Sequence, residues 1–83
     1  MVEIKVLGTG CKKCNELYET ALKAVEQSGV EVSVQKVEDI DAILAHGVMM
    51  TPGLMVGDEV KSTGRVPEVR QIVSWIMTEA GRS

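Results

Sequence analysis

The sequence has no long apolar run and no cluster of basic residues. A helix that crosses a bilayer needs about 20 mostly apolar residues. No segment of the 83 residues meets this requirement, so we expect no membrane partner. The nine lysines and arginines are scattered except for the neighbours Lys12 and Lys13, and the formal net charge is −3. Binding along a phosphate backbone requires clustered positive charge, so we also expect no nucleic-acid partner.

Cysteine is scarce as well, and the only two, Cys11 and Cys14, are separated by two residues. A disulfide between them closes a loop too short to restrict the unfolded chain much, so it would stabilise the fold little. The opening residues 1–10 lack the long apolar core of a secretory signal peptide. We therefore expect a cytoplasmic protein. In a reducing cytosol a close cysteine pair is usually redox-active or metal-binding.

The chain also lacks the composition of a disordered protein and the length of a multidomain one. Apolar residues make up 45% and charged residues 25% of the sequence, which is typical of a folded globular domain. We expect residues 1–83 to form a single domain. A chain of this length leaves no room for a cleft between two cores, so its chemistry must take place at the surface.

The first half of the chain predicts a strand, a helix and a second strand. Residues 3–7 alternate charged with apolar side chains, as a strand with one buried face does. From Cys14 onward apolar residues recur at steps of three and four until Ser28 and Gly29, which indicates a helix of about four turns. Valines alternate with polar residues over 30–37 and predict the second strand.

The second half predicts a short helix, a hairpin and a final helix. Residues 38–46 begin with acidic residues and carry apolar residues on one face, which indicates the short helix. Residues 53–56 and 59–63 are short strands joined by a tight turn. Pro67 suits the first turn of the last helix. With right-handed crossovers, the order β-α-β-α-β-β-α predicts an α/β fold, a four-stranded mixed sheet flanked by three helices.

The cysteine pair stands where the first predicted strand gives way to the first helix. Cys11 falls at the end of the loop and Cys14 one turn into the helix, so their side chains are neighbours that can be oxidised without refolding. The unpaired N–H groups and partial positive charge at a helix start stabilise a thiolate. These features predict a lowered pKa for Cys11. We expect Cys11 to attack a substrate disulfide as the nucleophile and Cys14 to resolve the mixed disulfide.

Lys12 and Lys13 separate the two cysteines and have two interpretations. They add positive charge beside Cys11 and are candidate pKa-tuning residues. The alternative is that both are solvated side chains at a helix start, where positive charge is slightly unfavourable.

Thr51 and Pro52 form the second part of the candidate site. A proline just before a strand normally marks only a loop, and most bonds that precede proline are trans. A cis bond would turn this loop toward the cysteine pair. The backbone N–H and C=O of Thr51 would then be free to pair with an extended substrate, which makes Thr51 and Pro52 candidate substrate-binding residues.

The CKKC segment at residues 11–14 and the Thr51–Pro52 pair, each in its predicted structural context, resemble the thioredoxin/glutaredoxin superfamily. The similarity is greatest to the small thioredoxin-like redox-active disulfide proteins of archaea and bacteria, and it runs from residue 2 to about residue 76. It implies a thioredoxin-like fold, a cis Thr51–Pro52 bond, a nucleophilic first cysteine and a resolving second cysteine. It also implies thiol-disulfide oxidoreductase activity on disulfide-containing target proteins, and electrons supplied by a thioredoxin-reductase-type donor.

Departures from thioredoxins proper are visible at the same segment. Thioredoxins usually carry a tryptophan before the first cysteine and glycine-proline between the two, where this chain has Gly10 and the two lysines. No acidic residue of this chain obviously matches the buried aspartate that assists the resolving cysteine of thioredoxin.

A soft-metal-binding or chaperone domain is the alternative for the same cysteine pair. The segment GTGCKKC also looks like the metal loop of small copper-binding domains. Those domains have the order β-α-β-β-α-β, whereas here a helix follows the second strand, and two thiols alone leave a zinc site incomplete. We therefore expect no metal and no cofactor other than the reversible Cys11–Cys14 disulfide.

Overall fold

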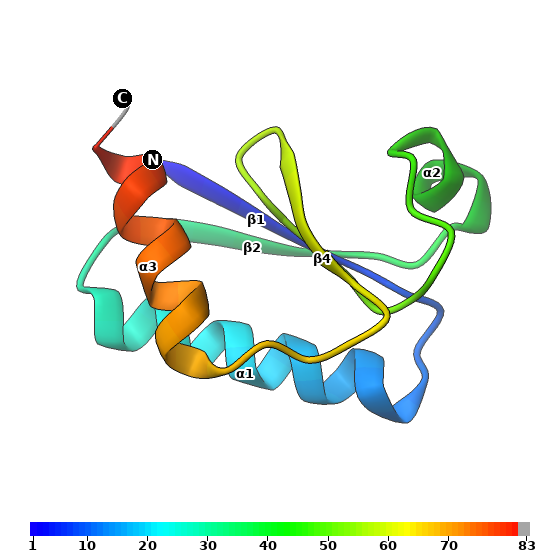
Figure 1. The fold of residues 1–83 in the computed structure, drawn as a ribbon, viewed down its shortest axis with the longest axis horizontal. Helices are drawn as coiled ribbons and strands as arrows, with labels where there is room; N and C mark the ends of the chain where they lie inside the picture. Colours follow the sequence, from blue (N-terminus) through cyan, green and yellow to red (C-terminus); the bar gives the residue numbers. More distant parts are fainter. Residues whose placement is uncertain (82–83) are drawn as a thin grey trace.

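The structure is a computed structural model, and residues 1–81 are described. Its elements follow the predicted order (Figure 1). They are β1 (Val2–Leu7), α1 (Lys12–Ser28), β2 (Val32–Val37), α2 (Ile40–Ala45), β3 (Gly53–Val56), β4 (Glu59–Thr63) and α3 (Val69–Ala80). No helix in this part of the chain combines the length and apolar character needed to cross a bilayer.

The four strands form one mixed sheet, as predicted, and their order in the sheet is β2-β1-β3-β4. β1 pairs with β2 in parallel, and the connection between them is the helix α1. β1 also pairs with β3 antiparallel, and β3 and β4 form the predicted hairpin. The hairpin register shifts between Leu54 and Met55, a β-bulge-type irregularity.

Helices cover both faces of the sheet. On one face α1 and α3 lie side by side and contact each other (Figure 1). They pack on the alternate side chains of β1, Val2, Ile4 and Val6. The helix residues Leu17 and Ile72 are fully buried in this main core. On the other face a smaller cluster is built from four buried apolar residues, Leu7, Ile43, Val48 and Met55. Successive side chains of a strand point to opposite faces of the sheet, so β1 contributes residues to both clusters.

The boundaries of α1 agree with the expected places of the two cysteines. Cys11 is the N-cap residue of α1, and Cys14 lies in its first turn. The helix ends at Gly29, whose φ of 67° lies in the left-handed region that favours glycine. The Ser28 side chain accepts a hydrogen bond from the Val30 N–H at this turn. β2 begins at Val32, two residues later than predicted.

Two details of the later elements differ from the prediction. α2 begins at Ile40, so Glu38 and Asp39 precede the helix, and Asp39 is an N-cap residue whose side chain makes no capping hydrogen bond. The placement of Pro67 in the first turn of α3 is wrong. The carbonyl of Glu68 accepts the first helical hydrogen bonds, so Glu68 is the N-cap, while Pro67 precedes the helix and is fully buried.

Candidate functional site

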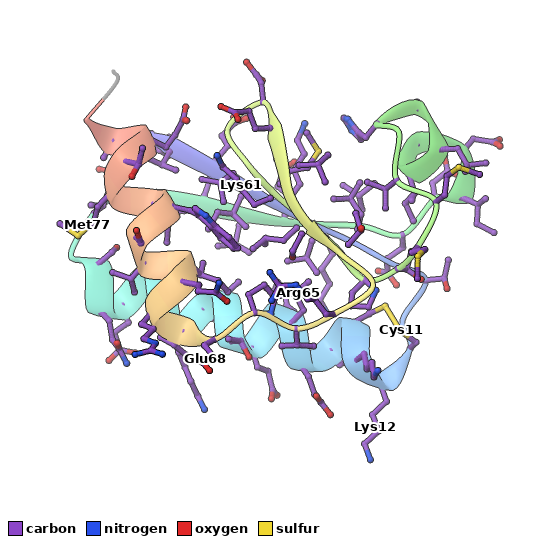
Figure 2. The ribbon with its side chains drawn as sticks, viewed as in Figure 1. Cys11, Lys12, Lys61, Arg65, Glu68 and Met77 are labelled. Atoms are coloured by element: carbon purple, nitrogen blue, oxygen red, sulfur yellow. A yellow bond between two sulfur atoms is a disulfide. The ribbon has the colours of Figure 1, made fainter. Side chains whose placement is uncertain are left out.

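The junction between β1 and α1 holds the cysteine pair. Gly10 has a φ of 87°, a left-handed conformation that turns the chain from the strand into the helix and favours glycine. Cys11 then takes an extended conformation as the N-cap, and its Sγ accepts a hydrogen bond from the Cys14 N–H at 3.2 Å. A disulfide joins Cys11 to Cys14, whose Cα atoms are 5.0 Å apart (Figure 2).

The two cysteines differ sharply in their exposure to solvent. Cys11 is exposed, whereas Cys14 retains only 5% of its accessible surface. Gly8, at the end of β1, makes room for Cys14. A Cβ atom on Gly8 would overlap the Cys14 Sγ and lie 3.0 Å from the Cys14 Cβ. No motif in the sequence indicates this role for Gly8.

Lys12 and Lys13 begin α1 and are both exposed. Neither makes an ion pair with another of the described residues. Figure 2 shows the Lys12 side chain extending outward from α1, away from the side of the molecule where α2 lies. Both lysines therefore supply positive charge at the helix start without being fixed by a protein partner.

The Thr51–Pro52 loop lies against the same junction. The peptide bond between the two residues is cis, and Pro52 is fully buried while Thr51 is exposed. The Pro52 carbonyl accepts a hydrogen bond from the Gly64 N–H at 2.8 Å, which ties the loop to the end of the hairpin. A Cβ on Gly8 would be 3.9 Å from the Pro52 Cα, so the loop approaches the Cys14 side of the junction.

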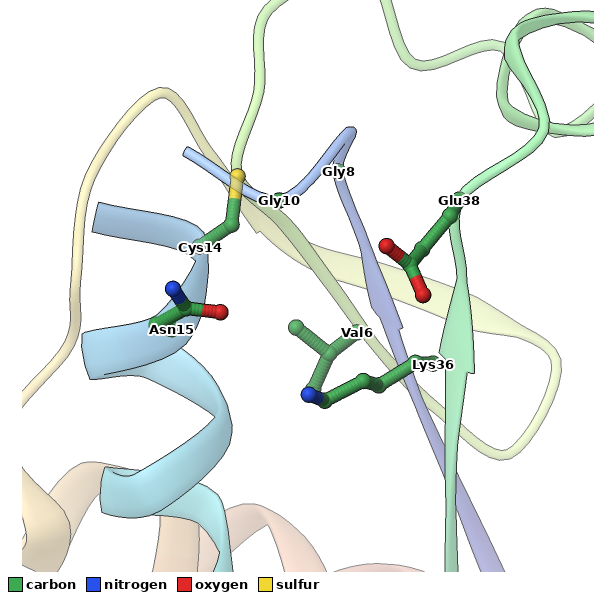
Figure 3. Close-up of a pocket in the computed structure, with 7 residues that line it drawn as sticks. All are labelled: Val6, Gly8, Gly10, Cys14, Asn15, Lys36 and Glu38. Carbon is green, nitrogen blue, oxygen red and sulfur yellow. The ribbon is translucent and has the colours of Figure 1, made fainter. Parts of the chain in front are cut away.

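Two charged residues that the sequence analysis did not assign to the site lie close to Cys14. A cavity of about 20 Å³ is lined by Val6, Gly8, Gly10, Cys14, Asn15, Lys36 and Glu38. Figure 3 shows Lys36 and Glu38 extending from the end of β2 toward Cys14 and Asn15 on α1. The Lys36 Nζ also lies 4.3 Å from the centre of the Tyr18 ring, within cation-π range. The cavity is large enough for about one water molecule.

The position of Lys36 follows from strand pairing. Lys36 is the register partner of Val6 in the parallel β1–β2 pair. The carboxyl ends of parallel strands meet at one edge of a sheet, and the cysteine loop begins at that edge. The β-α-β pattern and this rule together predict that the end of β2 lies beside the cysteine loop. Lys36 and Glu38 could have been identified as candidate site residues in this way.

No group of three or more His, Cys, Asp or Glu side chains within residues 1–81 is arranged to hold a metal ion. In the described residues, no His, Asp or Glu side chain is therefore placed with the two cysteines as a third metal ligand. The metal-binding alternative gains no support from this geometry.

A family model and two relatives identify the family of this chain. A model of the thioredoxin domain matches residues 2–77. A thioredoxin from Methanocaldococcus jannaschii is 43% identical over 72 residues, which cover 87% of this chain and 83% of the relative. A thioredoxin from Methanothermobacter thermautotrophicus is 38% identical over 77 residues, which cover 89% of this chain and 100% of the relative.

A solved structure agrees with these relatives in fold. It is thioredoxin-2, described as a component of the malaria parasite protein secretion machinery. Its TM-score with this chain is 0.68 at 15% identity, over 94% of this chain and 82% of that one. The family model and the two archaeal relatives support the activity as well as the fold. This activity is the one that the resemblance at the CKKC segment implied. The chain belongs to the thioredoxin family and is a thioredoxin-like thiol-disulfide oxidoreductase.

Proposed function

We propose that the protein reduces disulfide bonds in target polypeptides, with Cys11 as the nucleophile and Cys14 as the resolving thiol. The observation that carries this assignment is the position of Cys11, exposed and at the N-cap of α1, with its Sγ accepting the Cys14 N–H. A helix start and a backbone N–H donor both stabilise a thiolate, which is the reactive form of cysteine.

The first step is attack by the Cys11 thiolate on a target disulfide. A bond forms between the Cys11 sulfur and one target sulfur, the target S–S bond breaks, and the second target sulfur leaves as a thiolate that takes up a proton. Because Cys11 is exposed, an incoming disulfide can reach its sulfur without displacement of the core.

The second step releases the target. The Cys14 thiol loses its proton, and its thiolate attacks the Cys11 sulfur of the mixed disulfide. The Cys11–Cys14 disulfide forms, and the remaining target sulfur leaves. Two electrons have then passed from the protein dithiol to the target. Cys14 is buried beside Cys11, so it can reach that sulfur while it remains shielded from other disulfides.

The Thr51–Pro52 loop is the proposed docking edge for the target. Thr51 is exposed, and its backbone N–H and C=O make no hydrogen bond with the described residues. An extended target segment would supply the missing backbone partners, as an added strand does. The buried Pro52 holds the loop in place.

Lys12 and Lys13 are proposed to stabilise the Cys11 thiolate through their charge. Their exposure keeps this contribution small and sensitive to salt. Regeneration of the dithiol needs an electron donor, and thioredoxins receive electrons from reductases. We assign this role to a thioredoxin-reductase-type protein. A reduced dithiol carrier is suited to the cytoplasm, where thiols are kept reduced.

Thiol labelling and a reduction assay test the assignment together. In the reduced protein, alkylation near neutral pH should modify Cys11 first, while Cys14 reacts slowly because it is buried. With dithiothreitol as the electron source, the protein should accelerate reduction of a disulfide-containing test protein, and Cys11→Ser should abolish the acceleration. Faster alkylation of Cys14 would contradict the assigned roles, and reduction that survives Cys11→Ser would exclude the mechanism.

A further inference from the structure

The outer edge of β2 is open. β2 is the last strand on one side of the sheet, and β1 is its one strand neighbour among the described residues. The carbonyl oxygens of Glu31 and Val37 accept hydrogen bonds from N–H groups at the two ends of β1. The residues of a strand that bond to a parallel neighbour alternate along the chain, so the odd-numbered residues here bond to β1. The outward N–H and C=O groups therefore belong to Val32, Val34 and Lys36.

Half-buried apolar side chains lie along the same edge. Val32 and Val34 are on the α1 side of the sheet, where they pack against the main core. Tyr18 of α1 is half-buried on this side too, and the Lys36 Nζ lies 4.3 Å from the centre of its ring. An additional strand would pair with the outward backbone groups and would also remove this apolar surface from water.

The opposite edge of the sheet is protected in a way that β2 is not. β4 has a bulge-type register shift against β3, and its Glu59 and Lys61 form an ion pair at 3.4 Å. Bulges and charged side chains on an edge strand hinder pairing with another strand. β2, in contrast, keeps an unbroken register with β1 and carries one charged side chain, Lys36. Of the two edges, β2 is thus the one suited to accept a strand.

The edge of β2 is complementary to a second copy of itself. In an antiparallel ladder, residues whose backbone groups both point outward form the hydrogen-bonded pairs. If Val34 lies opposite Val34 of the second copy, Val32 of each copy lies opposite Lys36 of the other. All the outward groups of β2 are then paired. On the other face of the sheet, Ser33 lies opposite Gln35, so no like charges oppose each other within β2.

We propose that the protein forms a reversible homodimer through β2, in which the sheets of two copies join into one continuous sheet. The two-fold axis passes between the two Val34 residues. Because the strands are antiparallel and the cysteine loop lies beside the carboxyl end of β2, the two reactive sites are at opposite ends of the joined strands. A single pair of strands buries little surface, so the dimer is weak and depends on protein concentration.

Sedimentation of the full chain tests the interface. The mass of the wild-type protein should rise from that of one chain toward that of two as its concentration increases. Val34→Lys and Val34→Glu each place like charges opposite one another across the axis, and each should weaken association at least about tenfold. An equimolar mixture of the two variants should associate again, since lysine then faces glutamate. This rescue requires residue 34 to face itself, so it tests the register as well.

A second variant guards against a folding defect at the half-buried Val34. Neither Ser33 nor Gln35 is buried. Ser33→Lys combined with Gln35→Glu places a lysine opposite a glutamate twice in the proposed register, and it should strengthen association about three- to tenfold. Val60→Lys and Val60→Glu are the matched controls, because Val60 is an exposed valine of the other edge strand, and they should keep the wild-type dissociation constant.

The outcomes decide the interface independently of the proposed disulfide reduction, in which Val34 has no role. Wild-type protein that stays monomeric at every concentration would overturn the dimer. A mixture of the two Val34 variants that does not associate, or unchanged association in the Ser33 and Gln35 double variant, would overturn the interface. Equal weakening by the Val60 variants would place the contact at β4 instead. Association that disappears when dithiothreitol is added would place it at Cys11, and either result would overturn the proposal.

Discussion

Gly8 leaves the space that the Cys14 side chain occupies, so its substitution by alanine should act directly on the disulfide. A methyl group at this position would overlap the Cys14 Sγ and lie 3.0 Å from the Cys14 Cβ. In the oxidised protein the sulfur is bonded to Cys11 and cannot rotate away. In the reduced protein the thiol is free to change rotamer, which relieves part of the overlap. Gly8→Ala should therefore destabilise the oxidised form more than the reduced form.

The size of the effect follows from the cost of overpacking. An extra methyl group in a well-packed site costs about 1–3 kcal/mol. Replacement of glycine by alanine also stabilises a protein by about 0.4–1 kcal/mol through the unfolded chain, but this gain affects both redox forms and cancels between them. If the variant destabilises the oxidised form by about 1–2 kcal/mol more than the reduced form, the reduction potential of the cysteine pair rises by about 20–40 mV.

Equilibration with glutathione redox buffers would measure this potential, and urea unfolding of each redox form would measure the two stabilities. Gly81→Ala is a suitable control, since a Cβ there would make contacts of 3.5 Å with the carbonyl oxygens of Met77 and Thr78 and the backbone φ is −71°. We expect the control to keep the wild-type potential. An unchanged potential in Gly8→Ala, or an equal shift in both variants, would refute the reasoning.

Three further predictions concern the same core and site. Cys14→Ser should trap mixed disulfides with target proteins on non-reducing gels, whereas Cys11→Ser should trap none, and equal trapping would contradict the two-step mechanism. Lys36→Met should raise the pKa of the Cys14 thiol and move the pH midpoint of target release upward, while Glu38→Gln should move it downward, because the two side chains face Cys14 with opposite charge. Stopped-flow release of a labelled target at several pH values checks this, and shifts of the same sign would count against it. Leu17→Ala should cost about 2–5 kcal/mol in urea unfolding, because Leu17 is fully buried in the main core.

The elements that local patterns specify were predictable from sequence. The alternation in β1 and the turn between β3 and β4 each depend on neighbouring residues, and both are confirmed. The difference in burial between the two cysteines also follows from a local pattern. Cys14 lies three residues before Leu17 on α1, so the apolar stripe that enters the core also carries Cys14 inward, while Cys11 remains at the cap.

Features that depend on contacts between distant segments were not predictable in the same way. Lys36 and Glu38 reach the Cys14 cavity only because β2 pairs with β1 in a particular register, and neither residue belongs to a recognisable motif. The fit between Gly8 and Cys14 depends on the approach of α1 to the end of β1. Pro67 was misplaced because its suitability for a first helical turn is a local preference, and burial outside the helix overrode it.

Under the proposed roles, the first turn of α1 determines which sulfur is exchanged with other proteins. A thiolate stabilised by the helix start is a better leaving group as well as an available nucleophile, so bonds to the Cys11 sulfur both form and break readily. Burial of Cys14 disfavours its charged form, and of the two disulfide-bonded residues Cys11 is the exposed one while Cys14 is buried. A reductase that regenerates the dithiol must therefore attack Cys11 and leave Cys14 as the departing thiolate. The target and the electron donor thus use the same exposed surface around Cys11, and they cannot bind there at the same time.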